Sequence, residues 1–403
     1  MMKQPIVLAF SGGLDTSFCV PYLIDQGFAV HTLFVNTGGV SQQKEQEIEQ
    51  RAYELGATNH YSLDAKQALW NKTVIPLVWA NQLYQGKYPT LCADRYLIVE
   101  EAIKLCQQLN TPYIAHGCTG MGNDQVRFDL AVLAHGDYKI LSPIREIQKA
   151  HTQTRQYEID YLKAKGFTVS EQQNRYSVNE NLLGVTISGS EIDQWQEPSE
   201  DTYVLCNAPS KIKQCPTEIK LNFENGTPVA IEGESLAGAE ILQYLNHIGG
   251  QYGIGREIYT GDTVIGLKGR ILFEAPGIKL LQTAHKALEE VCLTNKQNQF
   301  KPLVAQQWTE LVYNGFYFDP LYQNVLACLQ SMQQQVTGQV TLKLHAHQAI
   351  AVAVQSHHLL ASDEASYAQS ASWGIEEAMG FIKLYGQSTT TWALVNQSQK
   401  KAG

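Results

Sequence analysis

The N-terminal part of the chain alternates short apolar runs with longer, mixed segments. Apolar runs typical of buried strands occupy residues 6–10, 30–35 and 60–63, and the segments between them, residues 16–26 and 42–55, have the composition of helices. Strands that alternate with helices in this way predict parallel βαβ units. We therefore predict an open, doubly wound sheet.

Two further strands of the same sheet are predicted at residues 113–115 and 139–141. Residues 93–108 predict a helix that leads to them, because apolar residues recur with helical spacing at 97, 98, 102, 105 and 109.

Polar or glycine-rich segments follow three of the predicted strands, and they begin at Ser11, Asn36 and His116. The carboxyl ends of parallel strands meet at one edge of an open sheet, and ligands bind at that edge. The sequence therefore predicts one ligand site built from these three segments.

The pattern changes near Thr168. Residues 219–223 and 229–231 flank the turn Glu-Asn-Gly-Thr-Pro, which is a hairpin signal, and a helix-like segment follows at residues 236–248. Residues 336–354 contain another pair of strands. These features predict a second domain of the α+β class.

The chain is thus divided into three parts. We predict an α/β domain with a doubly wound, mostly parallel sheet over residues 1–168, and an α+β domain over residues 169–362. Residues 363–403 are too poor in apolar side chains to form an independent core. They predict a tail that becomes ordered on a neighbouring subunit.

Composition narrows the classes of function. A length of 403 residues fits two domains, and a net charge of −9 excludes a global basic field of the kind that binds nucleic acid. The sequence has no apolar stretch of membrane-spanning length and no signal-peptide pattern at its start, so we expect a cytoplasmic protein without membrane contact. The eight cysteines form no Cys-x-x-Cys pair, which predicts reduced thiols and no zinc site.

The segment Ser11-Gly12-Gly13-Leu14-Asp15-Thr16-Ser17 lies between the first predicted strand and the first predicted helix. Adjacent glycines let the backbone approach an anion, the hydroxyl groups add donors, and the start of the helix contributes its positive dipole end. The segment has neither the Gly-Lys-Ser/Thr ending of a Walker A loop nor the Gly-x-Gly-x-x-Gly spacing of dinucleotide folds. It predicts a phosphate-binding turn of another type.

Residues 116–128 combine three glycines with hydroxyl, amide, carboxylate and guanidinium groups. Arg127 is suited to bind a carboxylate through two parallel hydrogen bonds, and Asp124 is suited to accept from an α-ammonium group. This composition predicts recognition of a small zwitterion. The competing interpretation is a solvated loop in which Asp124 and Arg127 form a structural ion pair.

The turn at residues 11–17 resembles the Ser-Gly-Gly-x-Asp-Ser signature of ATP pyrophosphatases. The run Thr119-Gly-Met-Gly-Asn-Asp-Gln-Val-Arg-Phe128, which follows His116-Gly117, closely resembles the hallmark of the argininosuccinate synthase family. Weaker likenesses to that family occur at residues 177–182, 252–256, 268–270 and 274–277.

The resemblance implies an ATP-dependent ligase of arginine biosynthesis that joins citrulline to aspartate through a citrullyl-AMP intermediate and releases AMP and pyrophosphate. It also implies small-molecule partners only, a homotetramer, and Mg²⁺ on the pyrophosphate oxygens without a dedicated protein metal site. The part over residues 169–362 then becomes the amino-acid substrate domain.

Site residues carried over by the resemblance fall into four groups. The residues expected to act in catalysis are Asp15 and Asp124. Those expected to bind ATP are Ala9, Phe10, Ser11, Gly12, Gly13, Leu14, Asp15, Thr16, Ser17, Val35 and Gly117. Those expected to bind aspartate are Thr119, Asn123 and Asp124. Those expected to bind citrulline are Tyr88, Asn123, Arg127, Ser177 and Thr186.

The chain departs from the family pattern at two positions. Family members usually carry a glutamate and a tyrosine that contact citrulline, where this chain has Gly261 and Phe273. Either neighbours such as Tyr259 and Asp262 replace them, or the acceptor is a modified citrulline, for instance an N-acylated one. The same sequence is also compatible with a catalytically silent ATP-binding homologue, or with a tRNA thiolase that uses Cys92 and Cys206.

Overall fold

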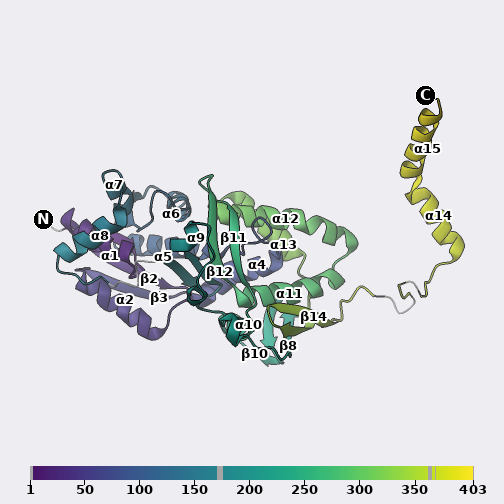
Figure 1. Ribbon diagram of the computed structural model, residues 1–403, viewed down its shortest axis with the longest axis horizontal. Helices are drawn as coiled ribbons and strands as arrows, with labels where there is room; N and C mark the ends of the chain where they lie inside the picture. Colours follow the sequence, from purple (N-terminus) through teal and green to yellow (C-terminus); the bar gives the residue numbers. More distant parts are fainter. Residues whose placement is uncertain (1–2, 170–175, 362–364, 368, 403) are drawn as a thin grey trace. The chain divides into compact units, whose positions relative to one another are not determined.

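The computed structural model describes residues 3–169, 176–361, 365–367 and 369–402 (Figure 1). Its first sheet has the strand order β3-β2-β1-β4-β5, and every neighbouring pair is parallel. The predicted doubly wound sheet is confirmed. The five strands are β1 (Gln4–Ala9), β2 (Phe28–Asn36), β3 (Asn59–Asp64), β4 (Tyr113–Ala115) and β5 (Lys139–Leu141).

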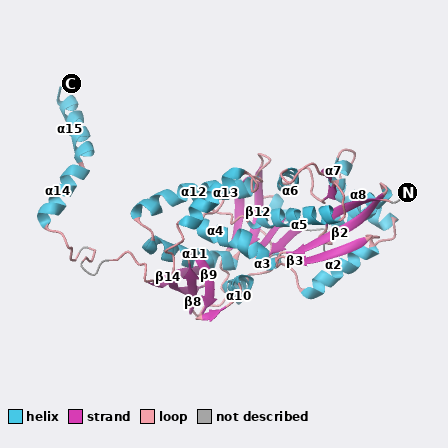
Figure 2. Ribbon diagram, turned by 180° about the vertical axis from the view of Figure 1, so that it is seen from behind, coloured by secondary structure: helices cyan, strands magenta, loops and turns pink. Residues whose placement is uncertain are grey.

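Helices cover both faces of this sheet (Figure 2). Side chains alternate between the two faces along a strand, so successive residues of the central strand β1 are buried under different helices. Ile6 and Leu8 belong to a core shared with the helices on one face, whereas Val7 packs in the core that contains α5 (Asp94–Gln108). The helices of the first face are α1 (Leu14–Asp25), α2 (Gln42–Glu54), α7 (Pro143–Gln148) and α8 (Thr154–Ala164).

Three short elements complete the helices of this part. They are α3 (Lys66–Leu69), α4 (Ile75–Ala80) and α6 (Asp124–Leu133). Helix α6 begins inside the run that carries the second predicted site, so the side chains of its first turn lie next to the loop after β4.

The C-terminal part contains a five-stranded antiparallel sheet with the order β10-β9-β8-β13-β14. The predicted hairpin and the later strand pair are both confirmed, and β13 joins them by pairing with β8. The strands are β8 (Thr217–Glu224), β9 (Thr227–Ile231), β10 (Glu234–Ser235), β13 (Gly338–His345) and β14 (Gln348–Gln355).

A second antiparallel sheet, with the order β11-β12-β7-β6, was not predicted. Its strands are β6 (Ser177–Asn181), β7 (Gly184–Ser188), β11 (Arg256–Asp262) and β12 (Lys268–Glu274). The helices of this part are α9 (Ser190–Asp193), α10 (Gly238–Gln251), α11 (Pro276–Cys292), α12 (Asn295–Asn314) and α13 (Pro320–Ser331).

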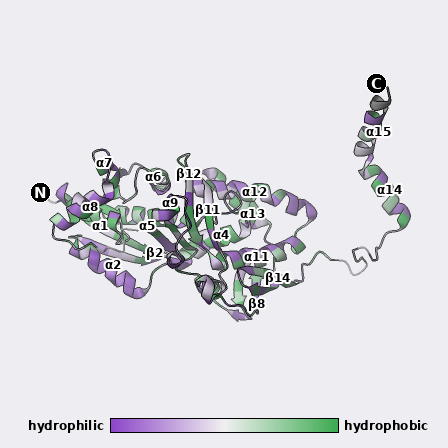
Figure 3. Cartoon of the chain, viewed as in Figure 1, coloured by the Kyte–Doolittle hydropathy of each residue, from purple (hydrophilic) through white to green (hydrophobic). Residues whose placement is uncertain are grey.

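The chain separates into two compact units, Met1–His358 and Leu359–Gly403. The second unit contains α14 (Ile375–Tyr385) and α15 (Gln387–Ala402), and α14 has many apolar side chains (Figure 3). The boundary predicted between residues 362 and 363 lies outside the described residues. Among the helices that the structure describes, none is long and apolar enough to cross a membrane.

A buried polar cluster lies within the first unit, between α11, α12 and the end of α13. Lys301 pairs with Glu289, Gln333 donates to Glu289 Oε1 over 2.9 Å, and Gln333 Oε1 lies 2.8 Å from Nε2 of His285. Nε2 is then the donor to Gln333, so in the neutral ring Nδ1 carries no proton, and Nδ1 has no partner among the described residues. Burial lowers the pKa of His285 to about 4.

We expect His285 to make the protein less stable in acid. Its folded pKa is below the ordinary value of 6.5, so the unfolded chain binds more protons between pH 4 and 6.5, and stability is lost as the pH falls through this window. One proton changes the free energy of unfolding by at most about 1.4 kcal/mol per pH unit. Urea unfolding at several pH values should therefore show a shallower pH dependence for His285→Gln. The exposed His357→Gln is the control, and equal slopes for both variants would contradict the expectation.

Candidate active site

The predicted phosphate-binding turn connects β1 to α1. Helix α1 begins at Leu14, earlier than predicted, so Asp15, Thr16 and Ser17 lie in its first turn. The Ser11 amide donates to Oγ1 of Thr16 over 3.3 Å, and the two hydroxyl groups lie 3.2 Å apart. Backbone amides at the helix start and these hydroxyl groups are the donors that a phosphate group requires.

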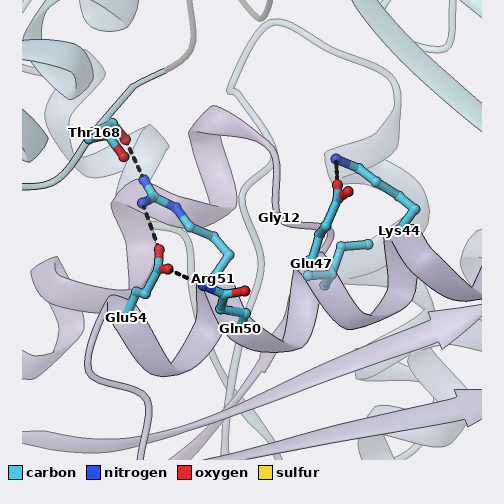
Figure 4. Close-up of a pocket in the computed structure, with 8 residues that line it drawn as sticks. Gly12, Lys44, Glu47, Gln50, Arg51, Glu54 and Thr168 are labelled. Atoms are coloured by element: carbon cyan, nitrogen blue, oxygen red, sulfur yellow. Dashed lines mark hydrogen bonds and ion pairs between the residues drawn. The ribbon is translucent and has the colours of Figure 1, made fainter.

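Gly12 explains why this turn needs glycine. Its φ of +73° is in the left-handed region, and a Cβ atom there would lie 3.1 Å from Cγ1 of Ile48 on α2. A cavity of about 250 Å³ lies beside Gly12 (Figure 4). Its two basic side chains are paired, Lys44 with Glu47 over 3.0 Å and Arg51 with Glu54 over 3.6 Å.

Asp15 faces a second carboxyl group that sequence reasoning missed. Helix α8 packs against α1, and Glu158 on α8 is 2% exposed and close enough to Asp15 for the charges of the two carboxyl groups to interact. Burial raises the pKa of both groups, that of Glu158 to about 9. Two adjacent carboxyl groups cannot both ionise readily, and Glu158, with a pKa of about 9, holds a proton at neutral pH. The sequence did contain a signal for a buried carboxyl group, because Glu158 lies on the apolar face of its helix together with Ile159 and Leu162.

The segment after β2 contacts the second domain. The Leu182 amide donates to the carbonyl of Thr37 over 2.8 Å, and a Cβ atom at Gly39 would collide with the carbonyl oxygen of Glu180. Val35, predicted to frame the nucleotide, is buried near the end of β2, just before this contact. The contact brings the end of β6 to the carboxyl edge of the parallel sheet.

The segment after β4 reaches the phosphate-binding turn. A Cβ atom at Gly117 would lie 3.0 Å from Cγ2 of Thr16, so the two predicted ATP-binding segments are in contact. His116 holds this segment, since Nε2 lies 2.8 Å from Asp129 Oδ1 and Nδ1 accepts from the Cys118 amide over 3.2 Å. Both ring nitrogens of His116 are thus used by contacts within the protein.

Asp124 lies between two guanidinium groups. Oδ1 accepts from Arg127 over 2.8 Å, and Oδ2 accepts from Nη2 and Nε of Arg95 over 3.0 and 3.1 Å. Burial would raise the pKa of Asp124, but the two arginines outweigh burial and lower it to about 2. Asp124 is therefore ionised at neutral pH, where it accepts hydrogen bonds and is a weak proton acceptor. Its predicted part in catalysis stays a prediction.

Arg127 is buried and held from two sides. Its Nε donates to the carbonyl of Tyr313 over 2.9 Å, its guanidinium carbon lies 4.8 Å from the centre of the Tyr313 ring, and Nη1 binds Asp124. Two of its five N–H groups are thus used by the protein. The remaining donors are those that a substrate carboxylate would engage.

Aromatic rings surround the predicted citrulline residue Tyr88. Tyr88 is 3% exposed, and its ring centre lies 5.6 Å from Phe273 and 6.0 Å from Tyr313. Thr186, another predicted contact, pairs with Phe273 in the register of β7 and β12. We call the rings of Tyr88, Phe273 and Tyr313 the aromatic wall. The fold thus brings Thr186 next to this wall.

Ser177 lies one pleat away from Thr186, because its partner Ser188 is two residues beyond Thr186 on the same face of the sheet. It is exposed at the start of β6, where it pairs with Ser188 of β7. Thr119 and Asn123 lie on the loop between β4 and α6. This loop is tightly folded, since a Cβ atom at Gly122 would lie 3.4 Å from Oγ1 of Thr119. The three aspartate-binding candidates therefore occupy one short segment that ends at Asp124.

Comparison with known proteins identifies the family. Residues 5–168 match the family model of the arginosuccinate synthase N-terminal HUP domain, and residues 176–392 match that of the arginosuccinate synthase C-terminal domain. The chain belongs to the argininosuccinate synthase family.

Three argininosuccinate synthases illustrate the similarity. The one from Xanthomonas campestris pv. campestris is 57% identical over 397 residues, which cover 98% of this chain and 100% of that protein. The one from Xylella fastidiosa is 54% identical and covers 99% of each chain. The one from Methanocaldococcus jannaschii is 36% identical over 96% of this chain and 97% of its own.

At the position of the usual family glutamate, Gly261 is crowded by the ends of two side chains. A Cβ atom at Gly261 would collide with Oε1 of Gln85 and lie 2.5 Å from the hydroxyl oxygen of Tyr259. Tyr259 and Asp262 were the neighbours expected to compensate, and both bind Gln85. Gln85 was missed because nothing in its local sequence distinguishes it from a surface glutamine.

The two cysteines that a tRNA thiolase would use are unsuited to sulfur transfer. Cys92 and Cys206 are 7% and 6% exposed, and burial raises the pKa of each thiol above its ordinary value. Thiols in this state are protonated at neutral pH and are poor nucleophiles. No group of three or more metal-ligating side chains is found in the described part of the chain.

Proposed function

We propose that this protein is an active argininosuccinate synthase, which joins citrulline to aspartate at the expense of ATP. The observation that carries the proposal is the contact between the phosphate-binding turn and the loop at Gly117, which continues into Asp124 and Arg127. A nucleotide site and a zwitterion site are therefore parts of one continuous surface. We also propose that the enzyme acts in the cytoplasm.

In the proposed reaction, the ureido oxygen of citrulline attacks the α-phosphorus of ATP. The bond between the α- and β-phosphates breaks, and pyrophosphate leaves. The amine of aspartate then attacks the ureido carbon, AMP leaves, and one proton is released. No protein side chain is needed as a covalent nucleophile, so catalysis depends on orientation and on stabilisation of charge.

The ATP phosphates are assigned to the turn between β1 and α1, where backbone amides and hydroxyl groups converge. Ala9, Val35 and Gly117 would frame the rest of the nucleotide, because each lies at the carboxyl end of a strand of the parallel sheet. The full set proposed to bind ATP is Ala9, Phe10, Ser11, Gly12, Gly13, Leu14, Asp15, Thr16, Ser17, Val35 and Gly117.

Mg²⁺ fits this turn as an ion held largely by the substrate. A magnesium ion bound to phosphate oxygens needs only one or two protein carboxylates, and Asp15, in the first turn of α1, would supply one. When bound, the ion would offset the negative charge that develops on the departing pyrophosphate.

The amino acids are assigned to the loop after β4 and to the aromatic wall. Thr119, Asn123 and Asp124 would bind aspartate, with Asp124 accepting from its ammonium group. Citrulline would contact Tyr88, Asn123, Arg127, Ser177 and Thr186. Because the pKa of Asp124 is about 2, we assign it the orientation of the attacking amine, and the released proton passes to water.

Release of pyrophosphate tests the proposal. The full-length protein is mixed with ATP and Mg²⁺, and citrulline and aspartate are omitted in turn. Release that requires citrulline, with argininosuccinate formed only when aspartate is present, is expected. Absence of release under every combination would overturn the proposal and favour a silent ATP-binding homologue.

Gly261 and Phe273 motivate a second candidate, a ligase of the same type that acts on an N-acylated citrulline. The usual carboxylate is missing at Gly261, and Phe273 presents an apolar ring to Tyr88. The same assay with N-acetylcitrulline separates the two candidates. Release with the acylated compound alone would assign the substrate to the modified class.

The C-terminal unit is proposed to join subunits into a homotetramer. Ile375, Met379 and Ile382 follow helical spacing along α14 and are 79%, 61% and 68% exposed. An apolar stripe of this kind requires a partner surface.

Deletion of residues 363–403 should therefore reduce the mass of the assembly measured by light scattering. Met379→Lys, which places a charge on the stripe, should have the same effect, whereas Glu376→Lys is the matched control next to it. An unchanged mass after the deletion would remove the tail from assembly.

A further inference from the structure

The segment between α4 and α5 carries backbone strain. Asn81, Gln85 and Thr90 each have φ near +49°, in the left-handed region that residues other than glycine rarely adopt. Such residues persist only where the surrounding structure fixes them, and they gather at functional sites. This segment carries Tyr84 and Tyr88, and the ring of Tyr88 belongs to the proposed citrulline pocket.

Gln85 attaches the strained segment to the hairpin of β11 and β12. Its Oε1 accepts from the Tyr259 hydroxyl over 2.8 Å and from the Asp262 amide over 3.1 Å, while Nε2 donates to Oδ2 of Asp262 over 2.7 Å. Three hydrogen bonds thus use both ends of one side-chain amide. Glycine at position 261 permits this close approach, since a Cβ atom there would lie 2.4 Å from Oε1 of Gln85 and would displace that side chain.

The tip of the same hairpin orients Asn123. The Val264 amide donates to Oδ1 of Asn123 over 2.9 Å, and Nδ2 of Asn123 donates to the Tyr313 hydroxyl over 3.4 Å. Tyr313 in turn donates to the Asp262 carbonyl over 3.3 Å. These contacts decide which end of the Asn123 amide faces the hairpin, and they leave one lone pair and one N–H for a substrate.

We propose that Gln85 is a positioning residue for the amino-acid site. It holds the hairpin in the place from which Val264 orients Asn123, and it holds the segment that carries Tyr88. The two citrulline contacts are thereby fixed relative to one another by one side chain that need not touch the substrate. The expected change in the KM for citrulline rests on the proposed function. The expected effect on the position of the hairpin rests on the hydrogen bonds alone.

Exchanging the amide and the carboxylate tests the proposal in the full-length enzyme. Gln85→Glu removes the donor to Asp262 and places two carboxylates together, so the KM for citrulline should rise about tenfold, as expected for the loss of one positioned hydrogen bond. The KM for ATP should stay within about twofold. Combining Gln85→Glu with Asp262→Asn restores a donor opposite an acceptor and should return the KM for citrulline to within about threefold of its original value.

Gln306→Glu is the matched control, because Gln306 is an exposed glutamine that also binds an acidic neighbour, Glu310, over 2.9 Å. Equal increases of the KM values for ATP and citrulline in Gln85→Glu, or failure of the exchanged pair to restore citrulline binding, would overturn the positioning role.

Hydrogen–deuterium exchange provides a reading that does not need turnover. Gln85→Ala should speed exchange at the amides of Asp262 and Val264, while Gln306→Ala should not. Unchanged exchange at both amides would overturn the inference. An original enzyme without citrulline-dependent turnover would overturn the proposed function instead, and the exchange measurement would still decide the structural role of Gln85.

Discussion

Asp15→Asn is expected to reduce pyrophosphate release at least about 100-fold while leaving the protein folded. The substitution keeps the shape of the side chain and removes its charge from the first turn of α1, beside the hydroxyl groups of Ser11 and Thr16. Loss of one preorganised electrostatic contact in an active site typically lowers the rate by about 100- to 1000-fold.

The environment of Asp15 makes the result specific. Asp15 and Glu158 are neighbouring carboxyl groups, and burial raises the pKa of each. Asparagine carries no charge that burial disfavours, so the midpoint of thermal unfolding should stay the same or rise. Loss of activity together with retained stability separates a functional carboxylate from a structural one. Near-normal turnover would exclude the proposed phosphate and metal role of Asp15.

Asp160→Asn is the control for this experiment. Asp160 lies on the exposed side of α8, two residues beyond Glu158, and binds only the neighbouring Gln156, over 2.9 Å, among the contacts described. Its substitution makes the same chemical change on the same helix without touching Asp15. Both pyrophosphate release and thermal stability should stay within experimental error of the original protein.

The parallel sheet and its ligand edge could be predicted because their signals are local. Apolar runs of strand length alternate with helical segments; Ser11 and His116 follow strands that the structure contains, and Asn36 is the last residue of one. Parallel pairing then brings these segments to one edge, as the contact between Gly117 and Thr16 demonstrates. Local composition was therefore sufficient to predict that these segments meet.

The sheet β11-β12-β7-β6 could not be predicted because its signals are weak and its pairing is non-local. Residues 177–181 are almost entirely polar, and residues 256–262 lack regular alternation of apolar and polar side chains. The pairing of Phe273 with Thr186 joins segments far apart in the sequence. Strand periodicity carries no information about such partners.

The residues that support the site were missed for the same reason. Glu158 contacts Asp15 only because α8 packs on α1, and Arg95 contacts Asp124 only because α5 and α6 pack together. Tyr313 reaches Arg127 from the end of α12. Residues of a motif can be found from the local sequence, whereas the residues that support them are found only from tertiary contacts.

Arg127→Lys is expected to raise the KM values for the amino-acid substrates about 10- to 100-fold and to leave the KM for ATP within about twofold. Lysine keeps the positive charge but has no planar fork, so it cannot bind Asp124 and the Tyr313 carbonyl and also present donors to a carboxylate. Each charge-assisted hydrogen bond that is lost is worth about 1.5–3 kcal/mol, which corresponds to this range of affinity.

Arg127 also has structural partners, so its two roles must be separated. Arg270→Lys is the control, because Arg270 donates to the backbone carbonyls of Ile192 and Gln196 away from the parallel sheet. If Arg127 binds substrate, Arg127→Lys should raise the KM values for the amino acids far more than Arg270→Lys does, although the two variants unfold at the same temperature. Equal weakening of ATP and amino-acid binding would assign Arg127 to the structure of the loop, because a substrate contact has no reason to affect a nucleotide held by the turn at Ser11.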